Sequence, residues 1–143
     1  MTTHNRRQLG GIVFLLAAIV VMAIAAYAAG RVRVGGWSLR ANGQLAKNFE
    51  YTGACPVSLK FGWSVLGTEP TAVTYTFERS DGGRDSSNHT LDLPVAERSG
   101  FVYYDWQLGA NDREFANFHG WVQLNVESPN HVTQKIDFTL HCR

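Results

Sequence analysis

The chain has 143 residues, with 13 Lys or Arg and 12 Asp or Glu, which gives a formal net charge of +1. All twelve acidic residues lie from Glu50 onward, whereas five arginines and no acidic residue precede Lys47. From Lys47 onward, eight basic residues face twelve acidic ones, a net charge of −4. This mildly acidic balance argues against a nucleic-acid-binding domain, which requires a basic stripe.

The chain begins with a basic region, residues 1–11, followed by an uncharged apolar run over residues 12–29. The run predicts one hydrophobic helix that either anchors the chain in a membrane or is a cleaved signal. Its length reaches the roughly 17–25 residues that span a bilayer and exceeds the roughly 7–15 apolar residues of a cleaved signal. The length favours an anchor, while the Ala-Tyr-Ala stretch at residues 26–28 keeps signal cleavage open.

The start of this apolar run also resembles the leader of type IV prepilins, since Gly11 precedes a long apolar helix. That family usually has Glu at the fifth position of the mature helix, where this chain has Leu16. The departure argues against a major pilin and leaves a minor, pilin-like filament subunit as an alternative.

Residues 30–48 are predicted to be a linker, because they contain Gly-Gly and Asn-Gly pairs and three arginines with little periodicity. Trp37 lies within this stretch. Its side chain suits a membrane interface, where Trp is favoured, and it suits packing against the following domain equally well.

The remainder of the chain alternates apolar and polar residues in short segments separated by turn signals. The predicted strands are residues 57–66, 72–79, 89–93, 101–108, 121–127 and 131–142. In segment 101–108 both sets of alternate residues contain apolar side chains, so alternation does not by itself choose the inward face. We place Val102, Tyr104, Trp106 and Leu108 toward the core. Short strands at intervals of about ten residues predict an all-β sandwich.

Every second residue after Cys55, and every second residue before Cys142, is large and apolar. Alternate residues of a strand share one face, so both thiols fall on core-facing positions. The pattern suggests one disulfide that joins the first and last strands of the sandwich. Such a bond persists only in an oxidising compartment. The domain is therefore expected outside the cytoplasm, in the cell envelope or secreted.

Five short sequence segments, taken in their order along the chain, form one recognisable pattern. They are Tyr51-Thr-Gly-Ala-Cys55-Pro56, residues 73–82, Gly120-Trp-Val-Gln-Leu124, Ser128-Pro-Asn130 and Phe138-Thr-Leu-His-Cys142. This order resembles a bacterial extracellular immunoglobulin-like or fibronectin-type-III-like module over residues 49–143. The resemblance implies a seven-stranded sandwich in which Cys55 is bonded to Cys142, acting as a binding or spacer unit.

The sequence gives little sign of catalytic chemistry. Its five histidines form no metal-binding spacing, and there is neither a CxxC pair nor a nucleophile elbow. Asp81, Asp85 and Ser86 carry oxygens that suit calcium, but the spacing is not that of an EF-hand and a solvated turn is favoured. We expect a non-enzymatic protein without a cofactor or a metal site.

Phe101, Tyr103 and Trp121 fall opposite the predicted core phase, with Tyr51 as a further candidate. An exposed aromatic cluster on a sheet would bind a protein or a sugar ring; alternatively the linker, neighbouring strands or a second subunit covers it. Loops 80–88 and 109–117 are further candidates, since loops on a rigid sandwich commonly carry binding.

These patterns together predict a non-enzymatic envelope protein, anchored by its N-terminal helix or secreted. Its immunoglobulin-like domain would mediate protein–protein or surface interaction, with a protein partner or by self-association. The alternatives are a pilin-like filament subunit and a carbohydrate-binding module that takes a glycan.

Overall fold

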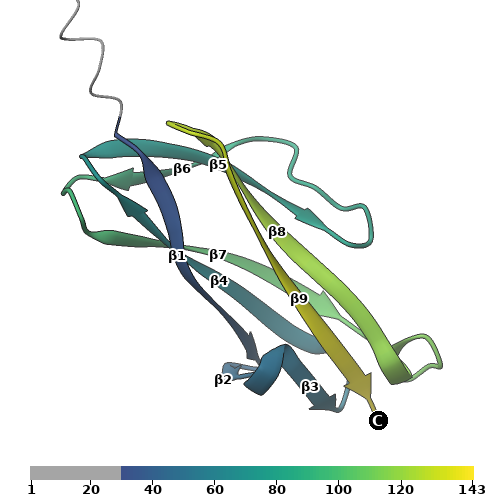
Figure 1. The fold of residues 1–143 in the computed structure, drawn as a ribbon. Helices are drawn as coiled ribbons and strands as arrows, with labels where there is room; N and C mark the ends of the chain where they lie inside the picture. The colour runs from purple at the N-terminus through teal and green to yellow at the C-terminus, as the bar shows by residue number, and fades with distance from the viewer. Residues whose placement is uncertain (1–29) are drawn as a thin grey trace, which may run out of the picture.

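Two β-sheets pack face to face across residues 30–143, the part of the chain that the computed structural model describes (Figure 1). One sheet has the order β2-β1-β4-β7 and the other the order β3-β9-β8-β5-β6. The strands are β1 (Val32–Ala41), β2 (Gln44–Leu45), β3 (Glu50–Gly53), β4 (Val57–Gly67), β5 (Thr71–Arg79), β6 (His89–Leu93), β7 (Ser99–Leu108), β8 (Phe118–Ser128) and β9 (Val132–Cys142). Two short 3-10 helices, η1 (Lys47–Phe49) and η2 (Phe115–Asn117), precede β3 and β8. The all-β, two-sheet prediction is confirmed, but the expected count of seven strands is wrong because these residues form nine.

The core lies between the two sheets and is filled by alternate residues of the long strands. β4 is the most deeply buried strand, because every second residue along it is almost fully removed from solvent. The inward residues of β4 are Val57, Leu59, Phe61, Trp63 and Val65. On β7, Val102 and Trp106 are buried while Phe101 and Tyr103 are exposed, so the predicted phase of this strand is correct.

The predicted linker over residues 30–48 is wrong, since β1 occupies residues 32–41 and belongs to the sandwich. β1 pairs antiparallel with β4, from Val32 opposite Gly67 to Ala41 opposite Leu59. The register shifts between Val34 and Gly36, which marks a β-bulge. A bulge inserts one residue and reverses the alternation of faces, so the stretch shows no continuous period of two.

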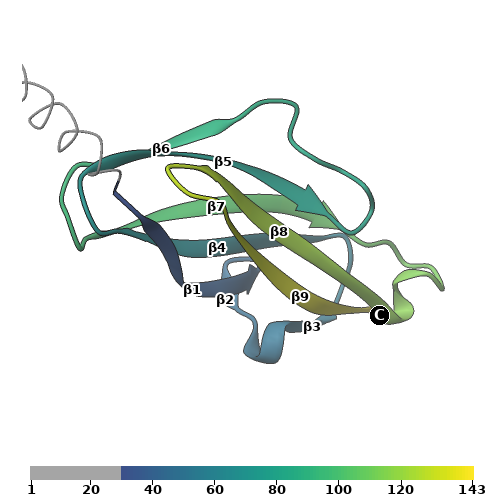
Figure 2. The same ribbon diagram turned by 45° about the horizontal axis from the view of Figure 1, so that its top comes forward.

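The start of β1 is fixed by the turn between β8 and β9. The side chain of Asn130 accepts a hydrogen bond from the backbone N–H of Val32 at 2.7 Å and donates one to the carbonyl of Val32 at 3.1 Å. This amide therefore acts as a one-residue extension of a β-ladder. Figure 2 shows the start of β1 and the β8–β9 turn at one end of the sandwich, with the C-terminus at the other.

The disulfide between Cys55 and Cys142 is present, with the two Cα atoms 5.5 Å apart. Its placement differs from the prediction, because Cys55 lies in the bend between β3 and β4 and not in the first strand. Cys142 ends β9, the last strand. Gly109 packs against the bond: a Cβ added there would lie 2.8 Å from the Sγ of each cysteine. The disulfide thus supports the start of the β7–β8 loop.

Replacing Gly109 with alanine is expected to lower the free energy of unfolding by about 1–3 kcal/mol, because its φ of +97° is strained for any other residue and the Cβ meets both sulfurs. Urea denaturation of the oxidised protein measures the loss. Gly43 is the matched control, since its φ is +82° but nothing lies within 4 Å of an added Cβ. Equal losses for Gly109→Ala and Gly43→Ala would show that contact with the disulfide contributes nothing.

The predicted hydrophobic helix of residues 12–29 and the basic region of residues 1–11 lie outside the described residues. Within residues 30–143, no helix combines the length and apolar character needed to cross a bilayer.

Candidate functional site

The three aromatic residues predicted to form one surface lie on two different sheets. Phe101 and Tyr103 project from β7 on the outer face of the four-stranded sheet, with 59% and 55% of their surfaces exposed. Trp121 is half-buried on β8 in the five-stranded sheet. Tyr51, the further candidate, is half-buried on β3 and donates a hydrogen bond from its hydroxyl to the carbonyl of Ala54 at 3.1 Å. The structure therefore brings together only Phe101 and Tyr103.

These two side chains border a shallow groove of about 380 Å³, called the aromatic groove below. Its floor consists of small residues from β1 and β4, namely Gly36, Ser38, Gly62 and Ser64. The ring of Tyr103 lies across Gly62, since a Cβ added at Gly62 would sit 3.0 Å from Cε1 of Tyr103. The small floor is what allows the tyrosine ring to rest on the sheet with its other face open to solvent.

Charged residues lie at one end of the aromatic groove. Arg40 lines it from β1, and Lys60 forms an ion pair with Asp105 at 3.5 Å. The Nζ atom of Lys60 also lies 5.7 Å from the centroid of the Tyr103 ring. All these groups are exposed, so the ion pair contributes little to stability, and the charges remain available to an incoming partner.

The sequence interpretation missed the contribution of β1 to this groove, because Gly36 and Ser38 lay in the expected linker. Trp37, which the sequence placed equally well at a membrane interface or against the domain, is part of β1. It stands opposite Trp63 in the ladder, and 46% of its surface is exposed. The apolar residues at every second position, Val32 and Val34 and then Leu39 and Ala41, were the signal in the sequence that could have identified this strand.

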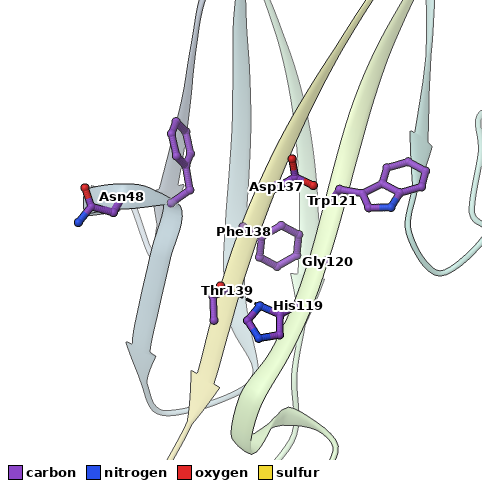
Figure 3. Close-up of a pocket in the computed structure, with 8 residues that line it drawn as sticks. Asn48, His119, Gly120, Trp121, Asp137, Phe138 and Thr139 are labelled. Carbon is purple, nitrogen blue, oxygen red and sulfur yellow. Dashed lines mark hydrogen bonds between the residues drawn. The ribbon is translucent and has the colours of Figure 1, made fainter.

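A second pocket, of about 440 Å³, lies on the five-stranded sheet near Trp121 (Figure 3). Its polar lining residues are Asn48, His119, Asp137 and Thr139. Nδ1 of His119 lies 3.1 Å from Oγ1 of Thr139. In Figure 3 the indole of Trp121 extends away from Asn48, and the Nζ atom of Lys135 lies 4.2 Å from the centroid of the Trp121 ring. The indole is thus engaged with a lysine and is not aimed at the middle of this pocket.

The acidic residues of loop 80–88 serve to close that loop. Asp81 accepts hydrogen bonds from Nε of Arg79 at 3.0 Å and from the backbone N–H of Gly83 at 2.9 Å. Asp85 accepts one from the backbone N–H of Phe77 at 2.9 Å, and its Oδ2 lies 2.9 Å from Nε2 of His89. Across the part of the chain described here, no three His, Cys, Asp or Glu residues are grouped to hold a metal ion.

Tyr75, beside this loop, stacks on His89 with ring centroids 5.3 Å apart. Burial, and then the charge of Asp85, raise the pKa of Tyr75 above its ordinary value of 10.0. The unfolded chain therefore loses this proton at lower pH than the folded protein. The stability that Tyr75 adds is complete below about pH 10 and is lost as the pH rises through the folded-state pKa.

Tyr75→Phe is accordingly expected to retain more of its stability than the unmodified protein between neutral pH and strongly alkaline pH. Thermal unfolding followed across an alkaline pH series measures this difference. Tyr103→Phe, which removes an exposed hydroxyl on the other sheet, is the control. Parallel alkaline profiles for Tyr75→Phe and the unmodified protein would contradict the expectation.

Comparison with known proteins bears on the fold. No protein-family model matches the sequence, and no curated protein matches it. Among solved structures, the chain is similar to the CARDB domain of a Pyrococcus furiosus protein, solved in complex with di-metal ions. The match has a TM-score of 0.50 and 9% sequence identity, and it covers 82% of this chain and 98% of that one. At this identity the likeness concerns the fold alone, and it identifies residues 30–143 as an immunoglobulin-like β-sandwich.

Proposed function

We propose that this chain is a non-enzymatic envelope protein, membrane-anchored or secreted, whose immunoglobulin-like domain binds a protein or a surface component through the aromatic groove. The observation that carries the proposal is the pair Phe101 and Tyr103, each more than half exposed beside a floor of glycine and serine. Adjacent exposed aromatics on a rigid sheet offer a large contact area at a small entropic cost.

The contrast between the two outer faces supports the choice of this groove. The outer face of the five-stranded sheet carries one half-buried ring, Trp121, among polar rows such as Glu78, Gln123 and Lys135, which stand side by side in the ladders. The outer face of the four-stranded sheet carries the two exposed rings. Exposed apolar groups that gather on one face mark interaction sites more often than isolated ones do.

The proposed location outside the cytoplasm is supported by the disulfide and by the apolar run in the sequence. Both cysteines of the chain are used in one bond, and such bonds persist in oxidising compartments. Residues 12–29 of the sequence have the composition of a membrane anchor or a signal.

Photo-crosslinking from the groove tests this function. Phe101 is replaced by p-benzoylphenylalanine in the full chain, cells are irradiated, and the products are identified by mass spectrometry. A discrete adduct is expected from position 101. The matched control carries the same residue at Gln123, on the outer face of the other sheet. Absence of an adduct from position 101, or the same adducts from both positions, would contradict the proposal.

A carbohydrate-binding role is the second candidate, favoured by the four polar side chains that line the pocket near Trp121. Carboxylate, amide, hydroxyl and imidazole groups are those that bind sugar hydroxyls. Glycan-array binding of the full chain that is lost in Asp137→Ala or Trp121→Ala, and retained in Phe101→Ala, would favour this role over the aromatic groove.

A further inference from the structure

Strand β7 presents the longest open edge among the strands that end the two sheets. β2, β3 and β6, the other terminal strands, have two, four and five residues, whereas β7 has ten. β7 pairs with β4 over ten consecutive residue pairs without a bulge. Because this ladder uses one side of the strand, the outward-pointing half of the N–H and C=O groups of β7 has no strand partner.

The devices that normally protect such an edge are missing from β7. Edge strands are usually blunted by lysine, proline, a bulge or a covering segment. β7 contains neither proline nor lysine, and its one charged residue, Asp105, is already paired with Lys60. Among residues 30–143, no backbone hydrogen bond outside the regular ladders reaches residues 99–108. The edge is therefore regular and open to pairing.

The two exposed rings lie along this same edge. Phe101 and Tyr103 are two residues apart on the outer face, a spacing of about 6.7 Å along a strand. A strand added to β7 would place its own alternate side chains directly beside these rings, at the roughly 4.5–5.5 Å that separates cross-strand neighbours. The groove and the open edge therefore form one continuous surface.

We propose that the open edge of β7 pairs antiparallel with β7 of a second copy of this chain, which joins the two four-stranded sheets into one. This inference rests on the proposed function, since it names the partner of the aromatic groove. The pairing is isologous, so each copy uses the same patch and the assembly closes at two.

The sequence of β7 selects one register for this pairing. With Val102 opposite Val102 of the second copy, Phe101 stands opposite Tyr103 on the outer face, and Ser99 stands opposite Asp105. Aromatic cross-strand pairs are favourable by roughly 0.2–1 kcal/mol each. A shift of one step toward the C-terminus places Tyr103 opposite Tyr103 and Phe101 opposite Asp105. A shift of one step toward the N-terminus places Phe101 opposite Phe101 and Tyr103 opposite Ser99. Either shift leaves one aromatic pair in place of two, and a larger shift toward the C-terminus brings Asp105 opposite Asp105, where like charges repel. The register centred on Val102 is therefore favoured, because it forms two aromatic cross-strand pairs.

The mass of the full chain in detergent, measured by sedimentation and corrected for bound detergent, is the first test. A dimer is expected for the unmodified chain and a monomer for the double variant Phe101→Lys, Tyr103→Lys, because lysine opposes edge pairing. Trp121→Lys, an aromatic-to-lysine change on the other sheet, is the matched control and should remain dimeric. A monomeric unmodified chain, or a dimer that withstands both lysines, overturns the proposal.

A cysteine crosslink tests the register and stays informative if the lysine variant fails to fold. The double variant Ser99→Cys, Asp105→Cys is expected to give a disulfide-linked dimer on mild oxidation. The off-register pair Ser99→Cys, Gln107→Cys is the control and should stay uncrosslinked. Equal crosslinking of the two pairs overturns the register. A monomeric chain that still crosslinks to a different protein from position 101 would overturn the self-pairing and leave the proposed function standing.

Discussion

Replacing both Cys55 and Cys142 with alanine is expected to lower the free energy of unfolding by about 2–5 kcal/mol. The bond closes a loop with a sequence separation of 87 residues, for which the chain-entropy model gives roughly 4–5 kcal/mol. Domains of this size are stable by only about 5–15 kcal/mol. The variant should therefore be marginally stable at physiological temperature, and urea denaturation with a two-state fit measures the loss.

The unmodified protein in a strong reductant is the control for this prediction, since it loses the same bond without a change of side chains. A loss below about 1 kcal/mol in the double alanine variant would contradict the expected role of the bond. Adding Gly109→Ala to the disulfide-free variant completes a double-mutant cycle. Gly109→Ala should lower the free energy of unfolding by less in the disulfide-free variant than in the unmodified protein. The two Sγ atoms that the added Cβ would meet are absent from that variant.

Replacing Trp63 with alanine is the second large effect, with an expected loss of about 3–5 kcal/mol. Trp63 is completely buried in β4 and packs against Phe61 and Phe77, with ring centroids 6.4 Å and 5.3 Å away. Alanine leaves a cavity between the two sheets. Long ladders of hydrogen bonds hold the backbones of both sheets in place, so the structure can close this cavity only in part. Chemical denaturation measures the loss in stability.

Trp63→Phe is the matched comparison, and its expected loss is clearly smaller. The indole Nε1 of Trp63 has no hydrogen-bond partner among the described residues, and an unpaired buried donor costs about 1–3 kcal/mol. Phenylalanine removes this donor while it keeps an aromatic ring in the core, so relief of the unpaired N–H offsets part of the smaller volume. Both variants lose the unpaired donor, so equal losses would show that the aromatic ring kept in Trp63→Phe contributes nothing to the packing of the core.

Strand phase was predictable from local sequence, whereas sheet membership was not. The alternation in β4 predicted which of its residues face inward. Segment 101–108 of β7 is apolar on both faces, and the phase placed there correctly left Phe101 and Tyr103 outward. Alternation reports only which face of its own strand a residue occupies. Whether two strands share a sheet depends on pairings between distant segments, and Trp121 was grouped with the other aromatics for lack of that information.

The first strand was missed for a different physical reason. Gly35 and Gly36 look like linker residues, and the bulge beside them reverses the alternation that would have identified β1. The floor of the aromatic groove depends on this strand. The disulfide, by contrast, follows from only two cysteines on core-facing phases, although Cys55 precedes β4 in a bend.

The disulfide also determines how the domain responds to tension applied between residue 30 and residue 143. A pulling force enters through β1, runs through β2 and β3 to Cys55, crosses the covalent bond to Cys142 and leaves at Arg143. Strands β4 to β8 and nearly all of β9 lie inside the closed loop, so tension between the two ends cannot extend them. Only about 25 residues can be drawn out, an extension of roughly 80–90 Å, after which the remaining sandwich acts as an inextensible link.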